Sequence, residues 1–457
     1  MRHPLIFQAL TAALVLAGAP ASAQHFEQGL RDPRVISPIG LGPQYSGLTG
    51  AGVGLVSKKP RYGVAAGDFI IQPRFFLEGS YRSNFFRVDT RNADPEGAFT
   101  LQLRPGVALF NPQYDKVAVS LGLDADVFVP ISGNEAATDQ TNVGGTARLS
   151  VALFPKSAFT LTLHEQFNRT IWMRPTVSLN ANRNWNRVGA DVSFHPGGRA
   201  LDFSLGYAYD LVSYDDLDDL DNDEHTLRFL ASWRFYPMTY TFLEATAGFM
   251  SYARSTTSDE LSRSGNYVDG APVKAYLGLS GYFTERLALL LRAGYGNSFL
   301  DRDPEDFSSF IGQAQLSYRF GPKTVLHGGI ARDFELAPLG GYMSFIRGYL
   351  TFTQRIGELA EFHADLAYDA RRFGEWVPAP RVSDGLTTIP VASEAERTEG
   401  YVRAGVVVDF DISRLVGVTV GYRYEGVLSD YSLSDSIATR FVAYDDHRVY
   451  GSLNLRY

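Results

Sequence analysis

Histidine is the side chain of this sequence best suited to acid–base chemistry, but its neighbours do not form a catalytic set. The histidines after residue 23 are His25, His164, His195, His225, His327, His363 and His447. His363 and Asp365 are two residues apart, so a strand would place both on one face, where the carboxylate could orient the imidazole. The sequence offers no identifiable serine partner, no G-x-S-x-G elbow and no H-E-x-x-H pattern. We therefore expect a protein that is not an enzyme, with a hydrolase as the minor alternative.

Carboxylates are concentrated in residues 213–224, where they could bind a divalent cation. The aspartates of this segment are Asp215, Asp216, Asp218, Asp219, Asp221 and Asp223. The segment lacks both the glycine and the final glutamate that an EF-hand loop requires at fixed positions. The chain has no cysteine, no glycine-rich phosphate loop and no Cys/His metal pattern. We expect no cofactor and a solvated loop at 213–224, with cation binding left open.

A larger set of charged residues lies at alternate positions of segments in which the intervening positions are mostly apolar. The set comprises Arg104, Asp124, Asp126, Arg148, Arg187, Asp191, Arg228, Arg234, Arg292, Arg319, Arg347, Glu361, His363, Asp365, Arg403, Asp409 and Arg423. Alternate residues of a strand share one face, so these groups are predicted to lie together. They could line a water-filled lumen and select solutes, or they could form Arg–carboxylate pairs that only stiffen a wall. For any single residue the second interpretation is favoured.

The segments that carry these charges are predicted to be strands. Every odd position from Leu201 to Tyr209 is large and apolar or aromatic, whereas every even position from Asp202 to Asp210 is small or polar. Comparable alternation recurs in segments centred near residues 76, 104, 121, 148, 163, 189, 205, 230, 246, 278, 292, 314, 329, 348, 365, 406, 420 and 451. A strand with one face in lipid has this pattern, and about 9–11 residues suffice for it to cross.

The connections between these segments alternate in length. The short ones contain turn residues and lie near 111–112, 155–156, 196–198, 237–238, 321–322 and 411–413. The long, polar ones lie near 84–97, 129–141, 171–183, 213–223, 253–271, 298–307 and 372–399. Aromatic residues suited to a membrane interface precede the short turns, namely Phe110, Phe154, Phe194, Phe235, Tyr236, Phe283, Phe320 and Phe410. These features predict an all-β, transmembrane, antiparallel up-and-down β-barrel of about 18 strands, with short periplasmic turns and long outer loops. A soluble periplasmic all-β protein is the alternative.

The amino terminus has the layout of a secretory signal peptide. Arg2 and His3 precede an apolar stretch, and Ala21-Ser22-Ala23 suits cleavage before Gln24. We predict a signal peptide at 1–23, a Gly/Pro-rich periplasmic segment at 24–68 and an outer-membrane barrel at 69–457. The segment 24–68 could be a tail, a docking segment or a plug, and the tail is favoured. The net charge of −8 argues against nucleic acid as a partner.

Residues 67–127 resemble the opening of the putative beta-barrel porins associated with exopolysaccharide loci in proteobacteria and myxobacteria. The resemblance rests on Ser83-Asn84-Phe85, Pro105-Gly106 and the spacing of Ser120, Gly122 and Asp124. Ser83 departs from the aspartate usual in that family. Over the remaining chain the resemblance is architectural. It implies a role in moving a polysaccharide across the outer membrane.

Three functions therefore remain open: polysaccharide export, passage of polar solutes, and a structural barrel in an envelope or surface-motility complex. The expected partners are outer-membrane lipids and lipopolysaccharide, with a polysaccharide or a periplasmic export protein as further candidates. The terminal Leu455-Arg456-Tyr457 alternates and ends in an aromatic residue. It resembles the signal that the outer-membrane barrel-assembly machinery reads.

Overall fold

The computed structural model of this chain describes most of the residues after position 62. The described residues are 63–86, 94–111, 116–133, 135–138, 140–170, 182–196, 200–215, 221–252, 269–301, 306–337, 341–374, 398–428 and 443–456. The predicted signal peptide and most of the segment 24–68 lie outside this set, so they stay predictions. No helix among the described residues is long and apolar enough to cross a membrane.

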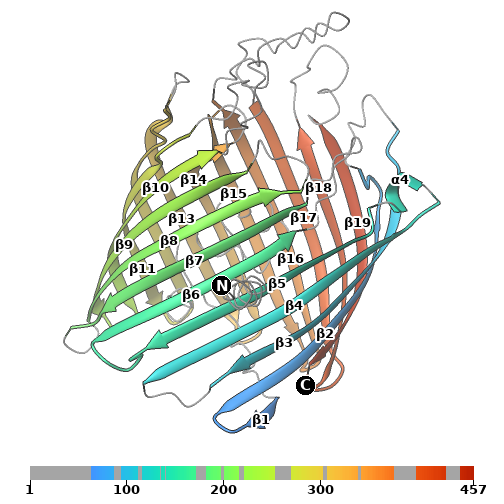
Figure 1. The fold of residues 1–457 in the computed structure, drawn as a ribbon, viewed down its shortest axis with the longest axis horizontal. Helices are drawn as coiled ribbons and strands as arrows, with labels where there is room; N and C mark the ends of the chain where they lie inside the picture. The colour runs from blue at the N-terminus through green and yellow to red at the C-terminus, as the bar shows by residue number, and fades with distance from the viewer. Residues whose placement is uncertain are drawn as a thin grey trace, which may run out of the picture.

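Eighteen long strands form one closed antiparallel barrel, and a short strand, β1 (Val64–Ala66), pairs with the start of the first of them. The long strands are β2 (Phe69–Arg82), β3 (Ala98–Phe110), β4 (Val117–Ile131), β5 (Asn142–Leu153), β6 (Phe159–Thr170), β7 (Arg183–Phe194), β8 (Leu201–Tyr214), β9 (Asn222–Tyr236), β10 (Thr239–Tyr252), β11 (Val273–Thr284), β12 (Leu287–Asn297), β13 (Ser308–Gly321), β14 (Thr324–Ala337), β15 (Gly341–Ile356), β16 (Ala360–Phe373), β17 (Thr398–Asp411), β18 (Val416–Leu428) and β19 (Tyr444–Arg456). Each pairs with its neighbours in sequence, so the strands follow one another around the wall (Figure 1).

The barrel closes where the last strand meets the first long one. β19 pairs with β2 from Arg448 opposite Arg82 to Arg456 opposite Arg74. At one end of this seam, Arg82 donates two hydrogen bonds to Asp446, at 2.9 and 2.5 Å. The side-chain amide of Asn84 donates to the backbone carbonyl of Asp445 at 3.1 Å. Closure leaves no free edge strand, which is required of a sheet in a membrane.

Alternation gives the wall two different faces. On β8, Leu205 and Leu211 are 57% and 48% exposed, whereas Ser204 and Asp210 on the other face are 8% and 2% exposed. A closed sheet in lipid needs this arrangement, because apolar side chains then meet hydrocarbon and polar ones meet the interior. Glu165 is an exception: it faces outward at mid-strand on β6, where it forms a hydrogen bond with Asn186 of β7.

The predicted barrel is confirmed, and each of the predicted strand centres lies inside one of the long strands. The long strands have 11 residues in β12 and up to 16 in β15, so all but β12 are longer than the 9–11 residues expected. A strand of about 14 residues at the usual tilt rises about 35 Å, more than an apolar band of about 25 Å. The strands therefore extend into water, where polar residues obscure the alternation that marks a lipid-facing segment.

Two local features were not predicted. A short helix, α4 (Glu135–Thr138), lies in the connection between β4 and β5. Among the aromatics before the short turns, Phe154, Phe283 and Phe320 are exposed. Phe110 instead falls on the inner face, because it lies opposite Ile70 and Ser120, which share that face by alternation.

Candidate functional site: the charged inner wall

All of the charged residues singled out from the sequence lie on the inner face. Cross-strand register shows this directly. Arg403 stands in one row with Ala367 and Glu425, and the large exposed hydrophobics of β16 and β17 lie on the opposite face. Inner-face charges are therefore neighbours across strands, close enough to pair. The geometry of these pairs decides which charges are available to a solute.

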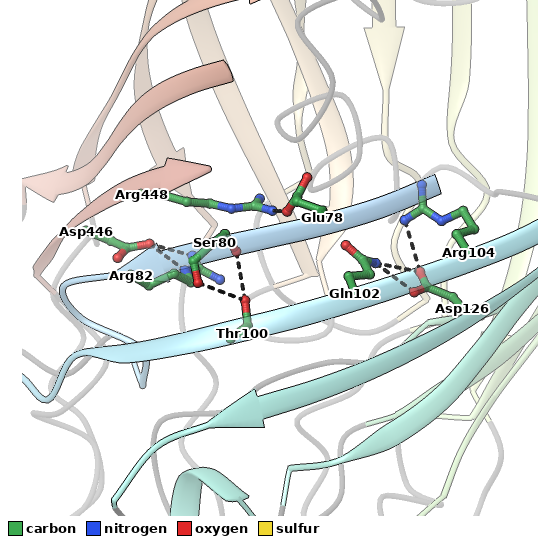
Figure 2. Close-up of polar contacts among 9 residues, drawn as sticks. All are labelled: Glu78, Ser80, Arg82, Thr100, Gln102, Arg104, Asp126, Asp446 and Arg448. Atoms are coloured by element: carbon green, nitrogen blue, oxygen red, sulfur yellow. Dashed lines mark hydrogen bonds and ion pairs between the residues drawn. The ribbon is translucent and has the colours of Figure 1, made fainter. Parts of the chain in front are cut away.

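On β2–β4 the arginines are held by aspartates from the next strands. Arg74 donates from Nε and Nη2 to both carboxylate oxygens of Asp124, at 2.7 and 2.6 Å. Arg104 donates from Nη2 to Asp126 at 3.0 Å, and Gln102 donates to the same carboxylate at 2.7 and 2.8 Å (Figure 2). Two-pronged contacts of this kind fix both the charge and the orientation of an arginine.

The Arg74–Asp124 pair explains the glycine of the Pro-Gly motif. Arg74 on β2 lies opposite Gly106 on β3, which in turn lies opposite Asp124 on β4. The guanidinium therefore has to pass over the middle strand. A Cβ atom at Gly106 would overlap the Asp124 carboxylate, and one at Gly122 would lie 3.6 Å from the Arg74 guanidinium. The glycine of the Pro-Gly motif thus makes room for this ion pair, whereas a side chain at Gly122 would be in ordinary contact with it.

A buried carboxylate organises the inner face of β7 and β8. Asp210 accepts from Arg187 Nη2 at 2.7 Å and from the indole nitrogen of Trp185 at 3.0 Å. The side chain of Asp210 is 2% exposed, so its charge depends on these donors. Asp191, also on β7, lies 3.3 Å from His164 Nδ1.

A second buried carboxylate lies between two arginines on β9–β12. Glu244 is 3.6 Å from Arg228 and 3.4 Å from Arg292. The Arg292 guanidinium also lies 4.5 Å from the ring centroid of Tyr276, a cation–π contact. The hydroxyl of Tyr276 donates to Asp333 at 2.9 Å. This part of the wall is a continuous polar network that joins strands far apart in sequence.

The inner face of β15–β17 is also paired. Arg347 donates to both oxygens of Asp369 at 2.7 and 2.8 Å, and Arg371 reaches the same carboxylate at 3.4 Å. Asp365 is 3.6 Å from Arg403. Arg423 is buried on the inner face beside this group, opposite Gly405 and Arg448.

The structure does not bring His363 and Asp365 together. His363 Nε2 instead lies 3.1 Å from Glu361 and 3.5 Å from Asp409. Asp365 lies 3.6 Å from Arg403. The hydroxyl of Thr353 lies 3.2 Å from His363 Nδ1, a partner that the sequence did not reveal. Acyl transfer also needs free backbone N–H groups to hold an oxyanion. The strands around His363 pair on both sides, so their backbone groups are committed to the sheet.

Three inner-face arginines remain outside these pairs. Arg148, Arg234 and Arg319 make no side-chain hydrogen bond or ion pair with another described residue. Arg148 is exposed although it faces the interior of a closed barrel, so its charge meets the space inside the wall. Arg234 and Arg319 lie close to the short-turn ends of β9 and β13.

The buried carboxylates at the centres of these networks were not named as site residues from the sequence. Asp210, Glu244 and Asp369 lie on the same inner face as the predicted residues. Strand parity would have found all three. Which of the many inner charges would be buried depends on neighbours from other strands, and parity carries no such information.

The described residues contain no group of three or more His, Cys, Asp or Glu side chains that could hold a metal ion. In the acidic segment, Asp215 forms an ion pair with Arg169 at 2.6 Å, and Asp223 accepts a hydrogen bond from Ser251 at 2.7 Å. Asp221 accepts from the backbone N–H of Tyr214 at 2.7 Å. Asp216, Asp218 and Asp219 lie outside the described residues, so cation binding by the whole segment stays a prediction.

A family model matches most of the strands of this barrel. The model of the family described as Putative beta-barrel porin 2 matches residues 60–370. A search of curated proteins gives no match. Solved structures with a similar fold include OpdK of Pseudomonas aeruginosa with vanillate (11% identity, 85% of this chain and 99% of that chain covered, TM-score 0.46). OccAB3 of Acinetobacter baumannii gives the same identity, coverage and TM-score. The siderophore receptor PirA of P. aeruginosa has 8% identity, with 85% and 80% covered and a TM-score of 0.43. The family match covers more than half of the sequence, and the chain therefore belongs to the Putative beta-barrel porin 2 family, as a porin-like β-barrel of the outer membrane.

Proposed function

We propose that the barrel is a water-filled channel that carries polar, preferentially anionic, solutes across the outer membrane. An exported polysaccharide is the substrate class that the family resemblance suggests, and unpaired inner arginines would favour an acidic one. The observation that carries the proposal is the set of three inner arginines, Arg148, Arg234 and Arg319, none of which forms an ion pair or a side-chain hydrogen bond with a carboxylate among the described residues. Arg148 lies within electrostatic range of Asp124, but both oxygens of that carboxylate are already bound by Arg74. Anion pores commonly use lysine or arginine in this way.

Pairing separates charges with a structural role from charges that a solute can meet. An arginine held by a carboxylate contributes little net field at a distance, because the opposite charges nearly cancel. An unpaired guanidinium on a water-exposed wall attracts anions from several ångströms away. A barrel of 18 strands is also wide enough for water unless a segment fills it. A preference for anions therefore follows from the pairing pattern, even though both signs of charge are common on the wall.

The dense ion pairing also supports a second candidate, a rigid structural barrel in an envelope or surface-motility complex. For both functions we propose that outer-membrane lipids and lipopolysaccharide surround the wall. The barrel-assembly machinery would act on β19, the strand that closes the barrel. A periplasmic export protein is a partner that only the polysaccharide function needs.

Conductance in a planar lipid bilayer tests the channel. The purified barrel should give stepwise currents. In a potassium chloride gradient, its reversal potential should lie closer to the equilibrium potential of chloride than to that of potassium. The variant R148Q/R234Q/R319Q should keep its conductance but lose most of that preference. The matched control is R104Q/D126N, which removes an arginine together with the carboxylate that holds it and should change selectivity little. Absence of current would refute the channel and leave the structural barrel. An unchanged reversal potential in the triple variant would refute the role of the arginines.

A deletion strain tests the substrate class. Loss of secreted polysaccharide, restored by the wild-type gene but not by a variant with a blocked lumen, would support export. Normal secretion with reduced uptake of small anions would instead assign the channel to general solute passage.

A further inference from the structure

The outer wall carries the same four-residue cluster twice, in separate parts of the sheet. The first is made of Tyr207, Tyr209, Asp223 and His225 on β8 and β9. The second is made of Tyr422, Tyr424, Asp445 and His447 on β18 and β19. The sequences around them correspond: G-Y-A-Y-D at 206–210 and G-Y-R-Y-E at 421–425, followed by D-E-H at 223–225 and D-D-H at 445–447. We name these groups the first and second His–Tyr clusters.

The geometry of the two clusters agrees closely. In the first, the Tyr207 hydroxyl and His225 Nδ1 are 2.7 Å apart, and the Tyr209 and His225 ring centroids are 4.8 Å apart. His225 Nε2 lies 3.8 Å from Asp223. Register places Tyr209 directly opposite His225.

In the second cluster, the Tyr422 hydroxyl and His447 Nδ1 are 2.8 Å apart, and the Tyr424 and His447 ring centroids are 5.1 Å apart. His447 Nε2 lies 3.7 Å from Asp445, and Tyr424 stands opposite His447. Two independent copies with the same contacts argue against a chance arrangement of surface side chains. In each copy the tyrosine hydroxyl fixes the ring at Nδ1, and Nε2 on the other side of the ring lies within 4 Å of the aspartate but beyond hydrogen-bond distance.

Both clusters face outward, near the ends of strands that connect through long loops. Tyr207 and Tyr422 are 43% and 40% exposed. His225 is roughly ten residues from Phe235 at the other end of β9, which corresponds to about 25 Å along the membrane normal. This is about the height of the apolar band in an outer-membrane barrel. The clusters therefore lie where acyl chains give way to head groups of the outer leaflet.

A groove in the outer wall adjoins the first cluster. It has a volume of about 510 Å³ and is lined by Leu163, Val188 and Ala190 together with Tyr207 and His225. A depression on a lipid-facing wall is occupied by lipid, and an apolar depression suits an acyl chain. The polar cluster can therefore contact the head group of a lipid while the apolar groove contacts its acyl chain.

We propose that each His–Tyr cluster binds the head group of an outer-leaflet lipid with a phosphorylated sugar, and that the groove holds an acyl chain of the lipid at the first cluster. When the tyrosine hydroxyl donates to Nδ1, the imidazole carries its proton on Nε2 and can donate it to a phosphate oxygen. The neighbouring aspartate accepts hydrogen bonds from sugar hydroxyls. The second tyrosine adds an aromatic face beside the imidazole. A simple phospholipid offers the phosphate but not the hydroxyls.

Native mass spectrometry of the full-length barrel in detergent, titrated with lipid A, tests this proposal. The wild type should retain two lipid A molecules. H225Q should retain one, and H225Q/H447Q should retain none at the same concentration. The matched control is H327Q, which changes an inner-face histidine bound to Ser317 and should retain two. Retention of two molecules by the double variant would overturn the proposal. Heat-modifiable migration on electrophoresis verifies that each variant is folded.

Two further arms test the chemistry and the groove. Dephosphorylated lipid A and phosphatidylethanolamine should each bind at least tenfold more weakly than lipid A, and equal binding of either would overturn the assignment of a phosphorylated sugar. A190L fills the groove and should remove one lipid, whereas A364L, on the outer face of β16, should remove none. If A190L leaves both lipids bound, the groove is not part of the site.

Discussion

Replacement of Gly106 by alanine tests the reason for the glycine of the Pro-Gly motif. Gly106 lies between Arg74 and Asp124 in one cross-strand row, and their ion pair passes over it. An added Cβ would overlap the Asp124 carboxylate and approach Arg74 Nε to 3.0 Å and the Leu123 carbonyl to 2.8 Å. The carboxylate is the group that can rotate away, and rotation breaks both hydrogen bonds to Arg74.

The expected cost follows from the exposure of this pair. The Arg74 and Asp124 side chains are 43% and 18% exposed, so water screens their attraction. We expect G106A to lower the free energy of unfolding by about 1–2 kcal/mol, from the lost pair and the displaced carboxylate. Alanine for glycine in an unobstructed strand should instead stabilise by about 0.5–1 kcal/mol. The control is G417A on the inner face of β18, where the nearest atom to a new Cβ would be 3.7 Å away.

Urea unfolding in lipid vesicles measures both variants, and the D124A background separates the causes. Without the carboxylate, G106A should cost less than in the wild type, because the pair is gone and only the Leu123 carbonyl, 2.8 Å from the new Cβ, still obstructs it. Equal stabilities of G106A and G417A would refute the steric argument. A full G106A penalty in the D124A background would assign the cost to the backbone of β4 rather than to the ion pair.

The remaining predictions concern a buried inner carboxylate and a charge on the outer wall. D210A should destabilise the barrel by about 3 kcal/mol, because it leaves Arg187 without its buried partner. D126A, which removes a 22% exposed partner of an exposed arginine, should cost less than about 1 kcal/mol in the same urea titration, and equal costs would show that burial is not decisive. E165L should stabilise the barrel in vesicles by about 1 kcal/mol, because a carboxylate on the lipid face gives way to an apolar group. A loss of stability would show that the hydrogen bond of Glu165 with Asn186 outweighs the cost of a carboxylate on the lipid face.

Local sequence was sufficient to predict the strands and the face of the sheet on which each side chain lies. The period of two is a property of each strand alone, so Leu201–Tyr209 shows its outer face without reference to any other segment. Short turns place the two strands of each hairpin side by side, whereas pairing across the long loops, such as β16 with β17, is shown by the register of the structure. The strand ends were less predictable, because β-strands that continue into water lose the apolar alternation that marks them.

The partner of each charge was decided only by the tertiary structure. Arg82 and Asp446 are separated by 364 residues and meet because the sheet closes on itself. His363 and Asp365 are adjacent on one face, yet they bind different neighbours supplied by adjoining strands. Whether Arg148 is neutralised depends equally on the strands beside it, although its inward direction was readable from parity. Sequence set the face of each side chain because that is local geometry, whereas pairing required the registers of the closed barrel.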